Sequence, residues 1–177
     1  VREKDQWGES FLFKINGKEF FAKGANWIPA DVIIPRITRE KYHKLIKAAA
    51  DANMNFLRAW GGGLYEQEDF YNECDEQGIM IWQDFMFACS TYPTFDPEFI
   101  ANVEGDFYDV LPRLRDHPCI ALLCGNNELE QGLVDYEWNE KSMSWDDYKP
   151  LFDEMLPRVC AELMPEVPYW PGSPHTP

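Results

Sequence analysis

Basic residues are scarce in this chain, and their scarcity excludes one large class of function. Lysine and arginine number 16 against 31 aspartate and glutamate residues, which leaves a formal net charge of -15 over 177 residues. No run rich in lysine or arginine is present, whereas proteins that bind nucleic acid present a positive surface. We therefore expect no nucleic-acid partner and favour a neutral, polar ligand.

Long apolar runs and paired cysteines are also missing. No stretch of about 18 apolar residues, the length that crosses a bilayer, occurs, so we expect no membrane span. The cysteines are odd in number (five) and form no C-x-x-C pair, which argues against a disulfide framework and a zinc site. We expect most of them to be small buried side chains. His43, His117 and His175 show no mutual spacing for a metal, so we predict neither metal nor cofactor.

A leader of charged and then apolar residues is likewise missing at the start of the chain. The chain begins at Val1 rather than at methionine, so we expect it to be part of a longer polypeptide, and no feature indicates a cellular compartment. Apolar material is plentiful: 45% of the residues are hydrophobic and 15% are aromatic. This is enough for the core of roughly one domain, with flat rings to spare for a sugar or another ring-shaped ligand.

Signals for strands and helices alternate along the chain. A hairpin with a type I′ turn at Asn16-Gly17 is expected first, over residues 11–21. Helices are expected after a cap at Thr38, before Gly78, from Pro97 to about residue 114, and after a cap at Ser144. Between Glu128 and Ser144 we expect an acidic, aromatic loop. The strands are expected near residues 25–28, 55–60, 79–85, 120–124 and 167–170.

This alternation predicts a parallel sheet with right-handed crossovers. A doubly wound sheet is disfavoured, because no G-x-G-x-x-G phosphate loop follows the first strand. Polar or aromatic residues end three successive strands, at Trp60, Asp84 and Glu128, as at the mouth of a (β/α)8 barrel. A full barrel has about 250 residues. We therefore predict an α/β fold, the N-terminal part of a TIM barrel with four to five βα units. Residues 24–177 would form this partial catalytic domain, and residues 1–23 a β-hairpin leading from a preceding domain.

The strongest functional signal is the end of the fourth strand. Residues 120–124 are entirely apolar and are followed at once by Gly125, Asn126, Asn127 and Glu128. An apolar strand of this kind is typical of a parallel sheet, whose carboxyl end is where α/β barrels carry their active sites. Glu128 is thus the first catalytic candidate. Its alternative interpretation is a capping or surface glutamate.

Five words of the sequence, in this order, resemble the β-mannosidases of glycoside hydrolase family two. The resemblance extends from about Phe11 to Pro174, and the WGGG word points to the mannosidase branch rather than to the galactosidases or glucuronidases. The words are GANWIP at 24–29, NMN at 53–55, RAWGGGLYE at 58–66, WQDFMFAC at 82–89 and GNNE at 125–128.

The resemblance implies a retaining exo-hydrolase that removes β-linked mannose from the end of an oligosaccharide or glycoprotein-derived glycan. It implies that Glu128 is the acid/base and that Asn127 binds the sugar's 2-hydroxyl, a contact that strengthens in the transition state. Trp60 would form a wall of the sugar site, and Asp84 would bind ring hydroxyls. The other two expected binding residues are Arg58, which would support the nucleophile, and Trp138, which would face the leaving group.

The nucleophile of such enzymes is a second glutamate on a later strand, beyond Pro177. We therefore expect this chain to need the remainder of the same polypeptide and not to hydrolyse glycosides alone. Trp60, Asp84 and Arg58 have structural interpretations as well, since barrel interiors also bury rings and ion pairs. Two alternative functions stay open: a family-two glycosidase of other specificity, such as an exo-β-glucosaminidase, and a non-catalytic carbohydrate-binding module.

Overall fold

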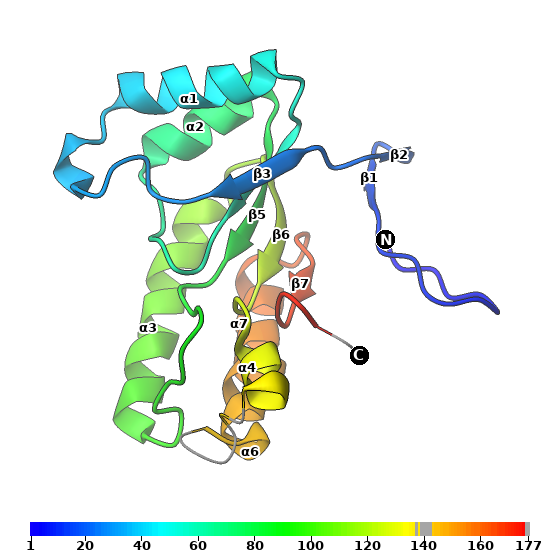
Figure 1. Cartoon of the computed structure of the whole chain (residues 1–177), viewed down its shortest axis with the longest axis vertical. Helices are drawn as coiled ribbons and strands as arrows, with labels where there is room; N and C mark the ends of the chain where they lie inside the picture. Colours follow the sequence, from blue (N-terminus) through cyan, green and yellow to red (C-terminus); the bar gives the residue numbers. More distant parts are fainter. Residues whose placement is uncertain (137, 139–142, 176–177) are drawn as a thin grey trace.

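A parallel sheet of five strands forms the centre of the computed structural model, which describes the chain except residues 137, 139–142 and 176–177 (Figure 1). The strands follow one another in space in their order along the chain, β3-β4-β5-β6-β7, with every pair parallel. No reversal of order occurs among these five strands, unlike in a doubly wound sheet. Their bounds are β3 Gly24–Trp27, β4 Phe56–Ala59, β5 Met80–Asp84, β6 Ile120–Cys124 and β7 Tyr169–Trp170.

Helices connect successive strands, as the alternation of signals predicts. Thr38 caps α1 (Arg39–Asp51), accepting a hydrogen bond from the Lys41 amide (3.3 Å). Gly78 ends α2 (Glu68–Gln77) in the left-handed conformation (φ 70°), which suits glycine. Asp96 caps α3 (Pro97–Leu114) through the Glu98 amide (2.9 Å). The helices are η1 Ile34–Arg36, α1 Arg39–Asp51, α2 Glu68–Gln77, α3 Pro97–Leu114, α4 Leu129–Asp135, α6 Trp145–Lys149, the π-helix η2 Pro150–Met155 and α7 Leu156–Leu163.

One expectation about the second half of the chain is wrong. Helix α4 follows Glu128 directly, where we expect an acidic loop. Pro157 does not interrupt a helix, because it is the second residue of α7, where the wide turns of η2 end and a missing N–H costs little. Pro112 lies in the last turn of α3, which continues to Leu114.

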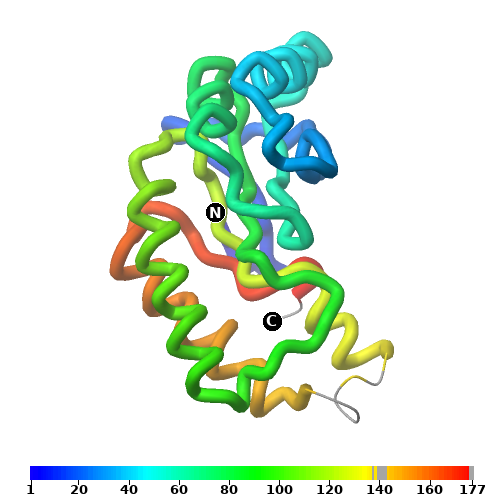
Figure 2. Tube along the Cα trace, turned by 90° about the vertical axis from the view of Figure 1, so that its left-hand side faces the viewer, coloured from blue at the N-terminus to red at the C-terminus, as the bar shows by residue number. Residues whose placement is uncertain are grey.

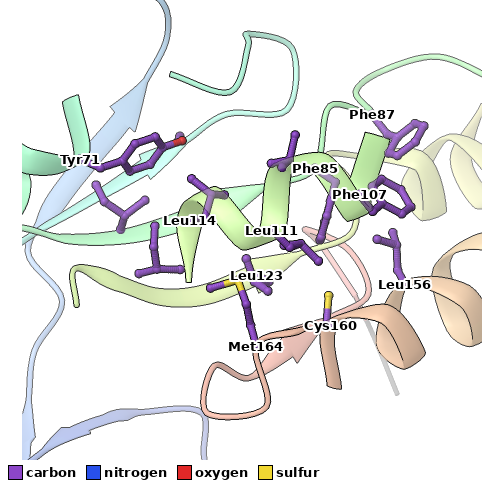
Figure 3. Close-up of a cluster of buried hydrophobic side chains, with 14 of the residues drawn as sticks. Tyr71, Phe85, Phe87, Phe107, Leu111, Leu114, Leu123, Leu156, Cys160 and Met164 are labelled. Atoms are coloured by element: carbon purple, nitrogen blue, oxygen red, sulfur yellow. The ribbon is translucent and has the colours of Figure 1, made fainter. Parts of the chain in front are cut away.

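One face of the sheet is covered by helices. The outward side chains of the strands, such as Leu57, Ile81 and Leu123, belong to the main hydrophobic core. The close-up in Figure 3 shows Phe107, Leu111 and Leu114 of α3 together with Leu156 and Cys160 of α7 and with Leu123 of β6. The view in Figure 2 shows α3 running beside the last helices, while α1 and α2 lie together at the other end of the sheet.

The other face carries the alternate side chains of the strands, and the N-terminal segment packs against it. Phe11 lies 6.3 Å from the Trp82 ring and 4.8 Å from the Trp170 ring, and Phe13 lies 4.8 Å from Phe56, all between ring centroids. This segment includes the antiparallel pair β1 (Phe13–Ile15) and β2 (Lys18–Phe20), on the side of the sheet away from α3 (Figure 1).

The prediction of an α/β fold with a parallel sheet is therefore confirmed. Within the described ranges, no helix has the length and apolar character needed to cross a membrane.

Candidate active site

The ends of β4, β5 and β6 bring the predicted polar residues to one edge of the sheet. Side chains alternate along a strand, so Arg58 on β4 and Asp84 on β5 both point to the face opposite the helices. The strands are paired in parallel, with Arg58 beside Trp82 and Asp84 beside Cys124. Asn127 lies just beyond the end of β6 and joins them through hydrogen bonds. Three of the residues expected to share a site thus meet in space.

Asp84 is the most deeply buried of these groups, with 0% of its surface exposed. Its carboxylate accepts hydrogen bonds from Arg58 (Nη2, 2.7 Å; Nε, 3.2 Å), from the amide of Gly61 (3.0 Å) and from the indole N–H of Trp82 (2.8 Å). Burial raises the pKa of Asp84, against the lowering effect of Arg58 and the other donors. Both oxygens are already occupied, so Asp84 fixes Arg58 and the Gly61 loop more directly than it offers an acceptor to a ligand.

Arg58 connects Asp84 to the residue beside the catalytic candidate. Its Nη2 also donates to Oδ1 of Asn127 (2.8 Å), and its guanidinium lies 5.7 Å from the centre of the Trp82 ring. The Arg58 side chain is 18% exposed. The guanidinium therefore presents positive charge at the sheet edge while its position is fixed from two sides.

Asn127 is held by its backbone as well as by its side chain. Its amide donates to the Phe87 carbonyl (2.9 Å), and its carbonyl accepts from the Cys89 amide (3.0 Å). The residue is 5% exposed, and its Nδ2 donates to the Cys89 sulfur (3.2 Å). With Oδ1 on Arg58 and Nδ2 on Cys89, the orientation of the amide is set.

Glu128 differs from its neighbours because it is exposed. Its backbone is left-handed (φ 66°), a strained conformation for a residue other than glycine that is often found at functional sites. The Glu128 amide donates to the Ser173 carbonyl (3.0 Å), and Oε2 accepts from the Cys89 thiol (3.3 Å). The chain thus turns so that a carboxylate faces solvent beside the Cys89 thiol, which also accepts a hydrogen bond from Asn127.

The two tryptophans expected to contact the substrate lie in different segments, Trp60 after β4 and Trp138 after α4. Trp60 is half-buried after β4, and its ring lies over Gly62, where a Cβ would come within 2.0 Å of the ring. Trp138 packs over Gly132 of α4, with Tyr136 beside it at 6.2 Å between centroids. Glycine at each of these positions leaves room for the ring, so both rings have a defined place.

Sequence reasoning missed two residues of this site. Four of the five cysteines are buried, as expected of most of them, and Cys89 is the exposed one. Asn126 is fully buried and ties the site together: its Nδ2 donates to Tyr148 (3.0 Å) and to the Pro171 carbonyl (2.9 Å), while Oδ1 accepts from the Leu129 amide (3.2 Å). The WQDFMFAC and GNNE words contain both residues, but spacing alone does not reveal their contacts.

Two further acidic residues have specific partners. Asp75 accepts from the Cys119 amide (2.8 Å) and contacts the ring of His117 (2.7 Å). Glu130 accepts from the hydroxyl of Tyr148 and contacts His175, both at 2.7 Å. Among the residues that the structure describes, no group of three or more His, Cys, Asp or Glu side chains is arranged to hold a metal. The chemistry offered is that of a carboxylate able to exchange a proton beside polar, oriented neighbours.

Comparison with known proteins finds relatives that are named as β-mannosidases. No family model matches the chain. β-Mannosidase B of Thermothelomyces thermophilus is 41% identical over 178 residues, which cover 96% of this chain and 21% of that protein. The β-mannosidase of Capra hircus is 50% identical over 143 residues, or 81% of this chain and 15% of that protein.

Solved structures agree with the sequence comparison. The crystal structure of β-D-mannosidase from Dictyoglomus thermophilum superposes with a TM-score of 0.91 at 50% identity, over 98% of this chain and 21% of that one. A β-glucuronidase of Bacteroides uniformis, 20% identical with a TM-score of 0.65 over 87% of this chain and 18% of that one, shares the fold. The chain spans about a fifth of the length of the curated relatives that it matches first. The expected resemblance to β-mannosidases is thus confirmed.

Proposed function

We propose that this chain, which is homologous to a segment of the β-mannosidases of glycoside hydrolase family two, supplies the acid/base half of a retaining exo-β-mannosidase site. The observation that carries the proposal is the exposed carboxylate of Glu128, presented at the sheet edge directly after Asn127, whose side chain is held by Arg58. The substrate is an oligosaccharide or glycoprotein-derived glycan that ends in β-linked mannose. Neither a metal nor a cofactor is required by this chemistry.

In this proposal Glu128 transfers the protons. In the first step it protonates the glycosidic oxygen as the bond to the sugar breaks, and in the second it removes a proton from the water that releases the sugar. A retaining mechanism needs a second carboxylate about 5 to 5.5 Å away as the nucleophile. We propose that this group comes from the remainder of the same polypeptide, so the segment alone does not hydrolyse glycosides.

The other site residues orient the reaction. Asn127, whose amide is fixed by Arg58 and Cys89, is placed to contact the 2-hydroxyl of the sugar. Arg58 provides positive charge near the nucleophile. We propose that Asp84 acts mainly by holding Arg58, because both of its oxygens already accept hydrogen bonds; its expected contact with ring hydroxyls has less support.

Trp60 and Trp138 form the proposed apolar parts of the site. Trp60 follows β4 at the same edge as Asp84 and would stack against the mannose ring. Trp138 lies beyond α4 and would face the leaving group.

We propose further that the sheet is the first part of a (β/α)8 barrel. Five parallel strands in sequential order with helices on one face support a closed barrel in the complete polypeptide. In this arrangement residues 24–177 belong to the catalytic domain, and residues 1–23 lead into it from a preceding domain.

The acid/base assignment is tested by leaving-group dependence in the complete polypeptide. A good leaving group needs no proton, so Glu128→Gln should retain most of kcat/KM, which reports the first step, on 2,4-dinitrophenyl β-mannoside. On a β-1,4-linked mannobiose it should lose about 10²- to 10⁴-fold in kcat/KM, the usual contribution of general acid catalysis. Glu166→Gln, at an exposed position remote in sequence, is the matched control. Equal losses on both substrates, or no loss, would remove Glu128 from this role.

The sugar is tested separately with the unmodified enzyme. We expect 4-nitrophenyl β-mannoside to be cleaved far faster than the matched β-glucosaminide. The reverse ranking would favour an exo-β-glucosaminidase, and binding of mannose without turnover would favour a carbohydrate-binding module.

A further inference from the structure

Cys89 is the cysteine that the proposed reaction leaves unused. The other four cysteines are buried, whereas Cys89 is exposed in the segment after β5. Its backbone is left-handed (φ 48°), as is that of Glu128. Two residues other than glycine thus adopt strained conformations, and their side chains meet.

The thiol contacts both proposed site residues. Its sulfur lies 3.3 Å from Oε2 of Glu128 and 3.2 Å from Nδ2 of Asn127. A thiol has one hydrogen to donate and can accept through sulfur. Since a carboxylate only accepts and an amide NH₂ only donates, the two contacts fix the direction of each hydrogen bond.

Backbone hydrogen bonds fix the distance between the Cys89 thiol and the Glu128 carboxylate. The Cys89 amide donates to the Asn127 carbonyl, and the Asn127 amide donates to the Phe87 carbonyl, so residues 87–89 and 127 form a short parallel bridge. The β5 and β6 ends therefore carry the thiol and the carboxylate at a fixed separation. A chance contact of two flexible surface side chains lacks this support.

We propose that Cys89 is a positioning residue for the acid/base: its thiol donates to Glu128 and accepts from Asn127, and so orients the carboxylate toward the glycosidic oxygen. This inference rests on the proposed function, because it deepens the role of Glu128. Cys89 itself does not form or break a bond.

The ionisation of the thiol is consistent with donation. Burial, and then the hydrogen bond and charge of Glu128, raise the pKa of Cys89, while Asn127 and Arg58 oppose this. The thiol consequently keeps its proton at neutral pH. The other ionisable groups around the pair are Tyr92, in the same segment, and the linked Arg58 and Asp84. Glu130 and His175 pair with each other near the segments that carry Glu128 and Ser173.

A hydrogen-bond donor to a carboxylate favours the ionised form of the carboxylate. Removing the donor should therefore shift the pH dependence of the activity in a predictable direction. In Cys89→Ala the basic limb of the kcat/KM profile on mannobiose should move to higher pH. Loss of orientation should also lower kcat on mannobiose roughly tenfold, with a small effect on kcat/KM for 2,4-dinitrophenyl β-mannoside and on KM for mannobiose.

The experiment uses the complete polypeptide and two controls. Cys89→Ser keeps a donor and an acceptor and should retain the normal limb and most of kcat. Ser90→Ala changes the next exposed residue, whose hydroxyl contacts only the Thr91 carbonyl among the described atoms, and should behave as the unmodified enzyme. A Cys89→Ala profile with an unmoved basic limb would overturn the proposal, as would a Cys89→Ser variant as impaired as Cys89→Ala.

A second measurement does not require activity. Because the carboxylate and the thiol influence each other's protonation, Glu128→Gln should let Cys89 ionise more readily. Iodoacetamide labelling of the Cys89 peptide, followed by mass spectrometry near pH 8, should then be roughly threefold faster or more. Glu166→Gln should leave the labelling rate unchanged. A labelling rate in Glu128→Gln equal to that of the unmodified enzyme would contradict the contact, whatever the activity of the variant.

The two proposals fail in different ways. If Glu128→Gln shows no dependence on the leaving group, the proposed function is wrong. If that dependence is present but Cys89→Ala leaves the limb in place, only the role of Cys89 is wrong.

Discussion

Arg58 joins two buried polar groups that belong to different strands, Asp84 on β5 and Asn127 after β6. The charge of Asp84 is tolerable at 0% exposure because a guanidinium, a backbone amide and an indole N–H all face it. Removing one partner of such a buried pair leaves the other charge without compensation, which is far more destabilising than losing a surface ion pair.

We therefore expect Arg58→Ala to lower the free energy of unfolding by about 3 to 5 kcal/mol. Urea denaturation of residues 1–177 at low protein concentration measures this value. Lys47→Ala, which removes an exposed partner of Asp51, should change it by no more than about 1 kcal/mol. A loss for Arg58→Ala as small as that for Lys47→Ala would show that the Asp84 charge is compensated elsewhere.

The residues of the site differ in how far the sequence predicts them. Glu128 and Asn127 are adjacent in the chain at the end of an apolar strand, so pattern and motif suffice to find them. The contact of Arg58 with Asp84 requires the register of β4 against β5, and the place of Cys89 requires the bridge to Asn127. Register is a property of the whole sheet, which explains why the sequence alone did not assign Cys89 to the site.

At the scale of elements, helix α2 is tied to the turn before β6 by a buried histidine. His117 contacts Asp75 (2.7 Å) and Glu68 (3.1 Å), both on α2. Burial alone lowers the pKa of His117, but the hydrogen bonds and charges of Asp75 and Glu68 outweigh it, and the net effect is a raised pKa. The protonated ring is therefore bound better in the folded chain than in the unfolded one.

The sign of the pH dependence follows from the raised pKa. The stability that His117 contributes is fully present below its unfolded pKa of about 6.5 and is lost as the pH rises through the higher folded value. We expect the free energy of unfolding of residues 1–177 to fall as the pH rises above about 6.5, and the fall to be smaller in His117→Gln. Glu68→Gln should also reduce it, and an equal slope in both variants and the unmodified chain would contradict this account.

A second junction of elements depends on a close approach of β6 and the segment after β7. A Cβ on Gly125 would lie 2.3 Å from the Pro171 carbonyl oxygen and 2.4 Å from the Tyr169 hydroxyl. Gly125→Ala should therefore destabilise the chain by about 1 to 3 kcal/mol, as overpacking does. Gly105 is the matched control, since it lies inside α3 and a Cβ added there would have no atom within 4 Å outside its own helix backbone. Gly105→Ala should stabilise by about 0.5 to 1 kcal/mol, and a similar sign for both would contradict the steric argument.

Elements with a long apolar pattern were predictable, and the short helix α4 was not. The strands and α1 to α3 carry apolar runs, caps or glycine stops that act locally. Helix α4 has seven residues, contains Gly132, and receives no hydrogen bond from the side chain of its own N-cap residue, Glu128. It is held instead by Asn126, whose side chain accepts from the Leu129 amide, and by Trp138 over Gly132. These are tertiary contacts that no local pattern records.

For the molecule as a whole, the two faces of the sheet are covered unequally. Helices bury one face, whereas the face with Phe56, Trp82 and Trp170 is partly covered by the N-terminal segment. Within the described part of the chain, no strand pairs with β3 on the side away from β4, and the same holds for β7 on the side away from β6. Unpaired strand edges tend to pair with other chains.

We accordingly expect isolated residues 1–177 to self-associate. Size-exclusion chromatography with light scattering should give an average mass above the 20.7 kDa monomer that rises with concentration. The net charge of -15 opposes association, and salt screens this repulsion over about 10 Å at 0.1 M. Association should therefore increase with ionic strength, whereas association driven by ion pairs would decrease.

A charge placed on the open edge distinguishes pairing between strand edges from non-specific association. Ala25→Lys introduces a lysine on the exposed β3 edge, a change that hinders pairing between edges, and should lower the average mass toward the monomer. Ser90→Lys adds the same charge at an exposed position outside the strands and corrects for the change in net charge. If both variants lower the mass equally, repulsion is responsible and edge pairing is not. If the unmodified chain remains at 20.7 kDa at all concentrations and salt levels, the edges are protected within the segment itself.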